Sequence, residues 1–218
     1  MAEERAIPPL PEISHIGFVV DDLEDAMDRF HDFFGIGPWL RYDYEPPRFT
    51  DRRYRGEPTA YSMRIALSDV GGPIDLGTQK VSTSTFGAIV EKLFAIRDRV
   101  LGRGKTAPGP DALFHAFPTP NMPGVNVELI EPVSGTSTYT DEFATSPLGV
   151  HHVGCFSYDD PYATVEAYLD AGIPIIQAGR YEGLEFWYLD LSEVLDGLLL
   201  EIAANIEHLP APEAIYEP

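Results

Sequence analysis

Two segments of this 218-residue chain place a histidine at the same point of the same local pattern. His15-Ile-Gly-Phe begins the first segment and His152-Val-Gly-Cys begins the second. Each is followed by acidic residues, an apolar stretch at helical spacing and a glycine. The spacing from His15 to Gly35 equals the spacing from His152 to Gly172, which indicates two copies of one supersecondary unit. Imidazole is a common metal ligand, so each copy carries a metal-competent side chain at an equivalent place.

Two glutamates also occupy equivalent places, near the end of each copy. Glu128 and Glu201 each lie on the second strand of a predicted hairpin, and an aromatic residue on the first strand (Phe114 or Trp187) precedes each at the same spacing. The strands of these hairpins are expected at 112–117 and 125–131 in the first copy, and at 184–190 and 198–203 in the second. Both copies therefore end on a strand that carries a carboxylate.

The residues between these points predict a strand followed by a helix in each copy. In the first copy the β-branched run 13–20 is a strand that places His15 and Gly17 on one face. In the second copy the strand 150–157 places His152 on the corresponding face. Acidic residues that can cap a helix follow each strand, and glycine ends each helix. The expected apolar stripes are Leu23, Ala26, Met27, Phe30, Phe33 and Phe34 in the first helix, and Tyr162, Val165, Tyr168 and Leu169 in the second.

The two copies differ in the middle. The second copy needs only the strand 173–178 between its helix and its hairpin, whereas the first has a long extra stretch, interpreted as an insertion at about 45–110. The insertion contains a basic loop (48–55), a hairpin (61–79) and a helix (86–101). The apolar stripe of that helix suits either a lid over a cleft or a contact between two copies of the chain in a homodimer. The predicted organisation is a first module at 1–145, a second module at 146–205 and an extended C-terminal tail at 206–218.

Composition argues against several classes of protein. Fifteen Lys and Arg against 35 Asp and Glu give a formal net charge of −20, which repels phosphate backbones and anionic lipids. We therefore expect no nucleic-acid partner and no membrane partner. The sequence has no run of about 18 apolar residues that could span a membrane, and its acidic N-terminus lacks the apolar core of a secretory signal. A single cysteine, Cys155, permits no internal disulfide and is typical of a cytoplasmic protein.

The repeated modules are similar to those of the vicinal oxygen chelate (VOC) superfamily, which includes glyoxalase I, methylmalonyl-CoA epimerase, bleomycin-binding proteins and extradiol dioxygenases. The resemblance covers about residues 12–45 and 112–205 and is closest to the glyoxalase I and methylmalonyl-CoA epimerase branch. Four motifs carry it: His15-Ile-Gly-Phe-Val-Val-Asp-Asp-Leu-Glu, Phe34-Gly-Ile-Gly-Pro-Trp, Glu128-Leu-Ile-Glu-Pro and Gly149-Val-His-His-Val-Gly. The resemblance implies an α+β fold in which two βαβββ modules pair into an incomplete, curved, barrel-like sheet around a metal cleft.

The resemblance also implies four metal ligands, namely His15, Glu128, His152 and Glu201. Two imidazoles and two carboxylates suit one divalent ion (Ni, Co, Mn, Fe or Zn) and leave positions for substrate or water. Asp75 is the alternative to Glu128, because its spacing from His15 is nearer to the spacing between His152 and Glu201. We prefer Glu128, because its hairpin matches the second module and its surrounding residues match the family better.

Other residues beside these motifs are candidates for supporting roles. His151 aligns with Ser14 and is expected to pack or to make hydrogen bonds that support the ligands. Cys155 falls on the strand face opposite His152, which predicts a packed thiol rather than a nucleophile. The basic loop could hold an anionic group of the substrate, and a histidine on the strand 112–117 could reach the cleft. The candidate substrate-binding residues are Arg48, Arg52, Arg53 and His115.

The implied site predicts a metal-dependent reaction on a small molecule. A substrate with two vicinal oxygens, such as a hydroxyketone or a malonyl-type thioester, would chelate the metal, which would stabilise the enolate formed when an adjacent C–H loses its proton. Glu128 or Glu201, displaced from the metal, would carry the proton. The expected enzyme is an isomerase, epimerase or lyase of glyoxalase type. Two alternatives stay open: an Fe(II)-dependent dioxygenase, and a metal-free small-molecule-binding protein of the bleomycin-resistance type.

Overall fold

The computed structural model describes residues 13–68, 125–141, 144, 149–156 and 158–218. The strands in this part of the chain are β1 (His15–Val19), β2 (Trp39–Tyr44), β3 (Phe49–Tyr54), β4 (Glu57–Pro58), β5 (Ser62–Ser68), β6 (Asn126–Ser134), β7 (His152–Cys155), β8 (Ile175–Tyr181), β9 (Leu184–Asp190), β10 (Leu199–Ala204) and β11 (Ala214–Tyr216). The helices are α1 (Leu23–Phe34), α4 (Pro161–Asp170) and the short 3-10 helix η2 (Ile206–His208).

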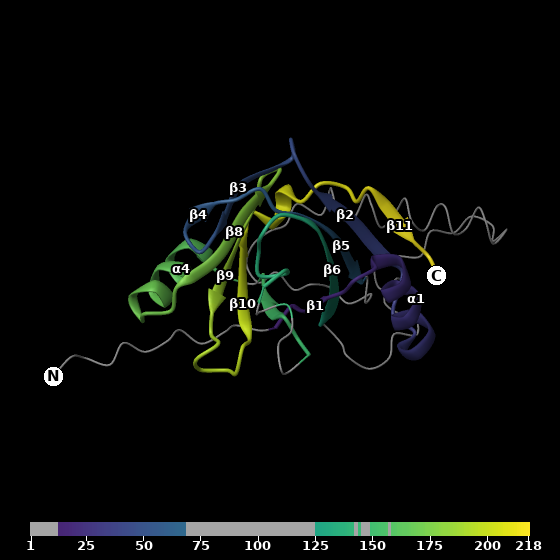
Figure 1. Cartoon of the computed structure of the whole chain (residues 1–218), viewed down its shortest axis with the longest axis horizontal. Helices are drawn as coiled ribbons and strands as arrows, with labels where there is room; N and C mark the ends of the chain where they lie inside the picture. Colours follow the sequence, from purple (N-terminus) through teal and green to yellow (C-terminus); the bar gives the residue numbers. More distant parts are fainter. Residues whose placement is uncertain (1–12, 69–124, 142–143, 145–148, 157) are drawn as a thin grey trace.

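The described strands form one mixed sheet that repeats its own order about a central pair. The sheet order is β11-β2-β5-β6-β1-β7-β10-β9-β8-β3-β4. On one side of the centre β1 pairs parallel with β6, and on the other β7 pairs parallel with β10, while β1 and β7 run antiparallel to each other. The sheet curls into an open barrel with α1 and α4 on its outside (Figure 1). This confirms the predicted α+β fold of two βαβββ modules joined in a curved sheet.

The two long helices form where the sequence predicted them, because their caps are in place. Asp22 accepts a hydrogen bond from the backbone N–H of Asp25 at 2.9 Å, and Gly35 ends α1 in the left-handed conformation with φ of 67°. Asp160 caps α4 in the same way by accepting from the N–H of Ala163 at 3.0 Å. Each helix then covers the outer face of its own module.

Three clusters of buried side chains make up the core. One outer core lies under α1 (Leu23, Ala26, Met27, Trp39, Ala66 and Leu129), and the other lies under α4 (Cys155, Tyr158, Val165, Tyr168, Leu189, Leu191, Leu200 and Ile202). The third, which we call the inner core, takes residues from both modules and is rich in tyrosine and phenylalanine (Tyr42, Tyr44, Phe49, Tyr61, Tyr139, Tyr181, Phe186 and Tyr188 among them). The placement of Cys155 in an outer core confirms the predicted packed thiol.

Part of the predicted helix stripes is wrong. Phe33 and Phe34 are 81% and 60% exposed, and Tyr162 and Leu169 are also exposed. The outer core under α1 takes in residues from Leu23 to Phe30, so the last helical turn lies beyond it. The periodicity identifies one face of the helix correctly but does not tell where the sheet beneath it ends.

The predicted partner of the strand that carries Glu128 is also wrong. Both edges of β6 are hydrogen-bonded, one to β1 and the other to β5, and a strand has only two edges. The sheet neighbours of β6 are therefore β1 and β5, and the segment 112–117 lies outside the described residues. Ser62–Ser68, assigned from the sequence to the insertion, is instead an internal strand of the first module's sheet.

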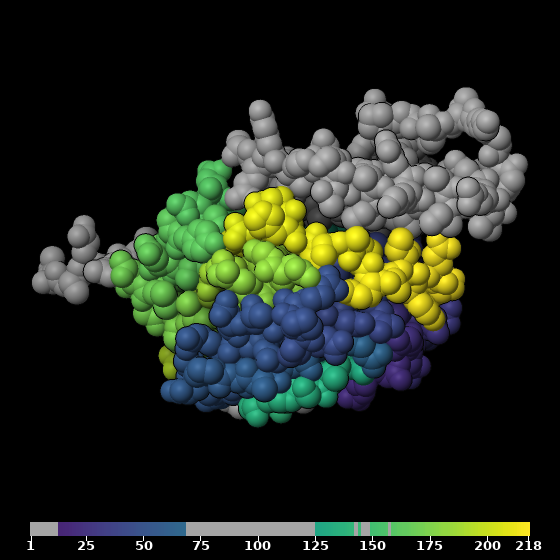
Figure 2. Space-filling model, turned by 90° about the horizontal axis from the view of Figure 1, so that it is seen from above, coloured from purple at the N-terminus to yellow at the C-terminus, as the bar shows by residue number. Residues whose placement is uncertain are grey.

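The predicted basic loop at 48–55 contains strand β3, which pairs antiparallel with β8 of the second module. Strand β11, within the predicted extended tail, pairs with β2 of the first module. Figure 2 shows this C-terminal segment, in yellow, running across the surface. The predicted boundaries of the modules stay predictions, and the expected helix at 86–101 and the turn of the hairpin at 61–79 lie outside the described residues. In the described part of the chain, no helix is long and apolar enough to cross a membrane.

Candidate metal centre

Strand register brings the two repeated motifs face to face at the centre of the sheet. In the β1–β7 pair, His15 lies opposite Gly154 and Gly17 lies opposite His152. The parallel neighbours add the carboxylates, because Glu128 on β6 is paired with Gly17 and Glu201 on β10 is paired with Gly154. Because side chains alternate along each strand, the two histidines and the two glutamates project from one face of the sheet.

The glycine of each motif leaves room for the histidine of the other module. A Cβ atom added at Gly17 would lie 1.9 Å from Cε1 of His152, and one added at Gly154 would lie 1.8 Å from Cε1 of His15. Any larger residue at either position would occupy the space of an imidazole ring. The two His-x-Gly motifs therefore interlock, because the histidine ring of each module fills the space left by the glycine of the other.

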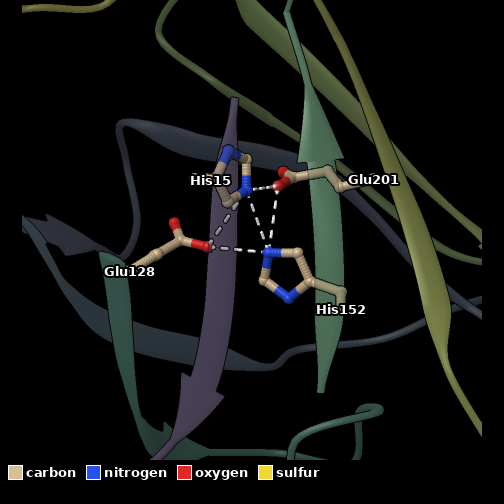
Figure 3. Close-up of side chains that lie close together, drawn as sticks. All are labelled: His15, Glu128, His152 and Glu201. Carbon is tan, nitrogen blue, oxygen red and sulfur yellow. Dashed lines mark hydrogen bonds and ion pairs between the residues drawn. The ribbon is translucent and has the colours of Figure 1, made fainter. Parts of the chain in front are cut away.

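The four side chains meet around one point (Figure 3). Each histidine is nearest to the glutamate of the other module: Nε2 of His15 lies 2.8 Å from Oε2 of Glu201, and Nε2 of His152 lies 2.9 Å from Oε2 of Glu128. The two Nε2 atoms are 3.0 Å apart. One potential ligand atom from each of the four residues lies within 4.8 Å of the others. All four residues are buried, so the four donors share a space largely protected from water.

Interactions within this cluster favour the charged forms of Glu201 and His152, although both side chains are buried. Burial by itself would raise the pKa of Glu201, but hydrogen bonds from His15 and His152 outweigh it and lower that pKa to about 2. Burial would likewise lower the pKa of His152, but the neighbouring carboxylates of Glu128 and Glu201 raise it to about 9. The carboxylates therefore stabilise positive charge at the point where the side chains meet.

The residues present fit a divalent metal ion. Two imidazole nitrogens and two carboxylates are ligands that first-row transition metals and zinc accept. Oε2 of Glu128 is buried and forms no hydrogen bond of good geometry in the described structure, although it points at the same space as the imidazoles. A buried carboxylate oxygen without a donor is costly, and a cation between the four side chains would satisfy it.

His151 lies beside the cluster and makes hydrogen bonds to His152 and to the backbone, one of the two roles that the sequence predicted. Its Nδ1 lies 3.0 Å from Nδ1 of His152, and its Nε2 lies 3.3 Å from the carbonyl oxygen of Thr138. Burial lowers the pKa of His151 well below its ordinary value, and the neighbouring His152 adds to that effect. His151 precedes the first residue of β7, so the alternation of the strand does not direct its side chain away from His152.

Buried tyrosines line the inner face beside the cluster. The ring of Tyr188 packs 4.9 Å from that of His152, and the hydroxyl of Tyr139 donates to the hydroxyl of Tyr188 at 3.0 Å. Burial raises the pKa of Tyr44, Tyr139 and Tyr188 well above the ordinary value, and the charges of Glu128 and Glu201 add to the shift. These phenols stay neutral and give the site an aromatic wall with hydroxyl groups.

The arginines predicted to bind substrate have different surroundings. Arg48 is engaged by two carboxylates, Glu182 at 2.6 Å and Glu213, and it packs over the ring of Tyr181. Arg52 is half-buried over the ring of Phe49, 5.6 Å from its centre, and donates to the carbonyl of Tyr61 at 2.8 Å.

Arg53 is exposed and donates to the backbone carbonyl of Gly56. Among the described residues, neither Arg52 nor Arg53 forms an ion pair with a carboxylate. Asp75 and His115 lie outside the described residues, so the choice between Asp75 and Glu128 is supported only by the presence of Glu128 in the cluster.

Sequence reasoning missed two features of this site. It placed His15 and Gly17 on one strand face, but it did not predict that each glycine of the repeat makes room for the histidine of the other module. It also missed the tyrosine wall. The alternation of Phe186 and Tyr188 along β9 was the available signal, because it places both on the inner face.

Comparisons with known proteins give one family match and distant structural neighbours. A sequence model of the family described as the Glyoxalase/Bleomycin resistance protein/Dioxygenase superfamily matches residues 14–188. Among solved structures, a methylmalonyl-CoA epimerase in complex with methylmalonyl-CoA and NH4+ is 15% identical, with a TM-score of 0.46, over 93% of this chain and 100% of that chain. Methylmalonyl-CoA epimerase from Mycobacterium tuberculosis is 13% identical, with a TM-score of 0.42, over 89% and 87% of the two chains. At these values the likeness assigns no reaction. The comparison with curated proteins gave no significant match.

Proposed function

The chain belongs to the glyoxalase/bleomycin resistance protein/dioxygenase superfamily, and from this premise we propose that it is a divalent-metal-dependent enzyme. Its substrate is a small molecule with two neighbouring oxygens, such as a hydroxyketone or a malonyl-type thioester. Its reaction moves a proton at the carbon next to the carbonyl, as an isomerase, epimerase or lyase does. The ligands of the metal are His15, Glu128, His152 and Glu201.

The observation that carries this proposal is the convergence of these four side chains. They come from four different strands and two modules, yet their donor atoms lie within 4.8 Å of one another in a buried space. Burying two carboxylates together is unfavourable unless a positive charge compensates them. The interlocking glycines leave room for the two imidazole rings, which supports a dedicated site rather than a chance cluster.

The residues of the chain divide the chemistry between them. A bound divalent ion supplies Lewis-acid stabilisation of negative charge on the substrate oxygens. Glu128 and Glu201 are the candidate proton carriers, because each has one carboxylate at the centre and no other acid among the described residues belongs to the cluster. The buried aromatic wall limits the access of water, which strengthens electrostatic interactions inside the site.

Of the three arginines, Arg52 is the best candidate for binding an anionic group of the substrate. Arg48 is already neutralised by Glu182 and Glu213, and Arg53 is exposed. Arg52 lies against Phe49 of the inner core, in a protein with a large excess of negative charge. A cation in that position would favour substrates that carry a carboxylate or phosphate.

Two other functions remain candidates and predict different results. A dioxygenase would consume oxygen when loaded with Fe(II). Dioxygenases of this superfamily usually use two histidines and one glutamate as ligands, whereas the cluster here has a second glutamate. A metal-free binding protein would need no buried donor set. The four convergent donors therefore favour the metal-dependent enzyme over both.

Metal analysis of purified protein tests the proposal. After expression with Ni, Co, Mn, Fe and Zn supplied, we expect about one divalent ion per chain, and loss of that ion in His15→Ala and in His152→Ala. His31→Ala, which changes an exposed histidine on α1, is the matched control and should keep the ion. Wild type without a stoichiometric ion would overturn the enzyme proposal. Retention of the ion by both cluster variants would overturn the ligand assignment.

Exchange of substrate protons in D2O tests the reaction class. The metal-loaded protein is incubated with hydroxyketones and malonyl-type thioesters, and NMR follows the proton next to the carbonyl. We expect exchange with wild type and its loss in Glu128→Gln or Glu201→Gln, because an amide does not accept the proton. Oxygen uptake by the Fe(II)-loaded protein, without proton exchange, would favour the dioxygenase instead.

A further inference from the structure

We propose that His151 is a positioning residue that fixes the tautomer of His152, so that Nε2 of His152 is the atom offered to the metal. The chain of contacts runs from the carbonyl of Thr138 through His151 to His152. This inference rests on the proposed metal-binding function of the cluster, and it gives one specific role to His151, which the sequence predicted only to pack or to make supporting hydrogen bonds.

Donor and acceptor rules determine where the protons lie. The carbonyl oxygen of Thr138 can only accept, so Nε2 of His151, at 3.3 Å, must carry the hydrogen. A neutral imidazole has one N–H, so Nδ1 of His151 is an acceptor. Nδ1 of His152 lies 3.0 Å away and must then donate to it. Since Nδ1 of His152 holds its hydrogen in this contact, Nε2, which faces Glu128, Glu201 and His15, is the nitrogen left for the metal.

His151 can impose this arrangement because it is held on every side. Its backbone N–H donates to the carbonyl of Gly17 at 2.9 Å, and its carbonyl accepts from the N–H of Leu199 at 3.2 Å. Its ring packs between those of Tyr139 and Tyr188, with centroids 5.1 and 5.5 Å away. The residue is 2% exposed, so water does not compete for either ring nitrogen.

Thr138 is held as firmly as His151. The side-chain oxygen of Gln177, on β8, accepts from the backbone N–H of Thr138 at 2.8 Å and from its hydroxyl at 3.2 Å. Both Thr138 and Gln177 are fully buried. The support of His152 therefore extends from the metal cluster to a strand three places away in the sheet.

The first module has no equivalent support. Ser14 occupies the position of His151 in the repeat, but its hydroxyl accepts from the backbone N–H of Phe156 at 3.0 Å. Nδ1 of His15 is buried and has no hydrogen-bond partner in the described part of the chain. The two ligating histidines are thus alike in position and unlike in what orients them. This contrast supplies an internal control for the proposal.

Two substitutions separate a positioning role from a packing role. His151→Phe keeps a ring of similar size between Tyr139 and Tyr188 but removes both hydrogen bonds. His151→Asn loses ring packing, but its side-chain oxygen can still accept from Nδ1 of His152. Positioning predicts that Phe weakens metal binding about 10- to 100-fold, the usual effect of losing such a partner, and that Asn recovers most of the affinity. Packing predicts the reverse order, with Asn the more damaging.

The experiment titrates metal-free wild type and variants with Co²⁺, followed by visible absorption and by competition with a chelator. Ser14→Ala is the matched control and should bind within about threefold of wild type, a difference well below 1.4 kcal/mol. Denaturant unfolding of each metal-free variant reports whether packing was lost. If wild type binds no Co²⁺, the proposed function fails. If wild type binds and His151→Phe binds equally well, the positioning role alone is overturned.

A measurement on wild type keeps the test independent of whether the variants fold. Nitrogen-15 NMR of the Zn²⁺-loaded protein identifies the protonated nitrogen of each imidazole. We expect His152 with hydrogen on Nδ1 and metal on Nε2, and His151 with hydrogen on Nε2. Metal on Nδ1 of His152, or hydrogen on Nδ1 of His151, would overturn the inference.

Discussion

The two central strands carry the same motif and reach the same site from opposite directions, but the structure around them differs. In the β1–β7 pair, the histidine of each strand lies opposite the glycine of the other. Each histidine is also nearest to the other module's glutamate. Behind them the likeness ends, because His152 has His151 as a partner and Nδ1 of His15 has none in the described structure. The side chains that would contact the metal are repeated in both modules. The residue that orients the histidine, His151, has no equivalent in the described part of the first module.

The same division holds at the edges of the sheet. Among the described strands, β3 and β4 have no counterpart in the second module, and β3 extends the sheet beyond β8. Arg48, just before β3, is joined to Glu182 and Glu213. Changes in the repeated centre should therefore affect metal binding through both modules, whereas loss of the ion pairs of Arg48 at the edge should affect stability but not metal binding.

The largest expected effect comes from the interlocking glycines. Gly17→Ala and Gly154→Ala each place a methyl group inside an imidazole ring of the other strand, so that ring must leave the cluster. We expect metal affinity to fall more than about 100-fold in both variants, and the free energy of unfolding to fall by about 1–3 kcal/mol, the usual cost of overpacking. Metal titration and denaturant unfolding measure these quantities. A large effect in one variant only would break the symmetry of the centre.

A double variant provides the control for the glycine prediction. His152→Ala removes the ring that the methyl group of Gly17→Ala would strike, so the combined variant should be more stable than the sum of the two single changes predicts. The same holds for Gly154→Ala combined with His15→Ala. Purely additive effects would mean that the glycines act through the backbone rather than by making room.

An intermediate effect is expected from metal loading. A ligand that binds only the folded protein stabilises it by about 2.7 kcal/mol at a free concentration of 100 times its dissociation constant. Thermal unfolding with and without Co²⁺, and after removal by chelator, measures this gain. We expect it to vanish in both His15→Ala and His152→Ala, because the ion needs both modules. Stabilisation that persists in one of them would show that a single module holds the ion.

The smallest effect is expected at the asymmetric edge. Arg48→Gln removes ion pairs to Glu182 and Glu213 whose side chains are partly exposed, so it should lower the free energy of unfolding by at most about 1 kcal/mol. Metal affinity should not change, since none of these residues belongs to the cluster. Denaturant unfolding in low and high salt checks the first statement, and Co²⁺ titration checks the second. A marked loss of metal affinity would contradict the separation of centre and edge.

Much of the fold and of the candidate site follows from local sequence patterns. The alternation along 13–20 and 150–157 correctly placed His15 and His152 on one face, and acidic residues correctly marked the starts of α1 and α4. These inferences hold because the period of a strand and the capping of a helix depend on residues that are neighbours in the chain. The repetition of the pattern then predicted two equivalent modules.

The identity of strand partners did not follow from local patterns. Strand β6 pairs with β5, which the sequence assigned to the insertion, and the predicted basic loop contains a strand that pairs with β8. Several segments of this chain have similar alternation, so each could pair with more than one edge. The choice among these pairings depends on which arrangement of all the strands leaves the fewest edges without hydrogen bonds. No single segment encodes that arrangement.

The sequence by itself determined that each copy carries a histidine at an equivalent place on a strand face, because residue type and strand period are properties of each segment alone. The resemblance to the family then identified the candidate ligands, with Asp75 as the alternative to Glu128. Only the tertiary structure decided how those side chains meet. Gly17 faces His152 rather than its own histidine, and His151 is linked to the carbonyl of Thr138. These contacts join segments that are distant in the chain, and they exist only after β1 and β7 have paired and the sheet has curled around them.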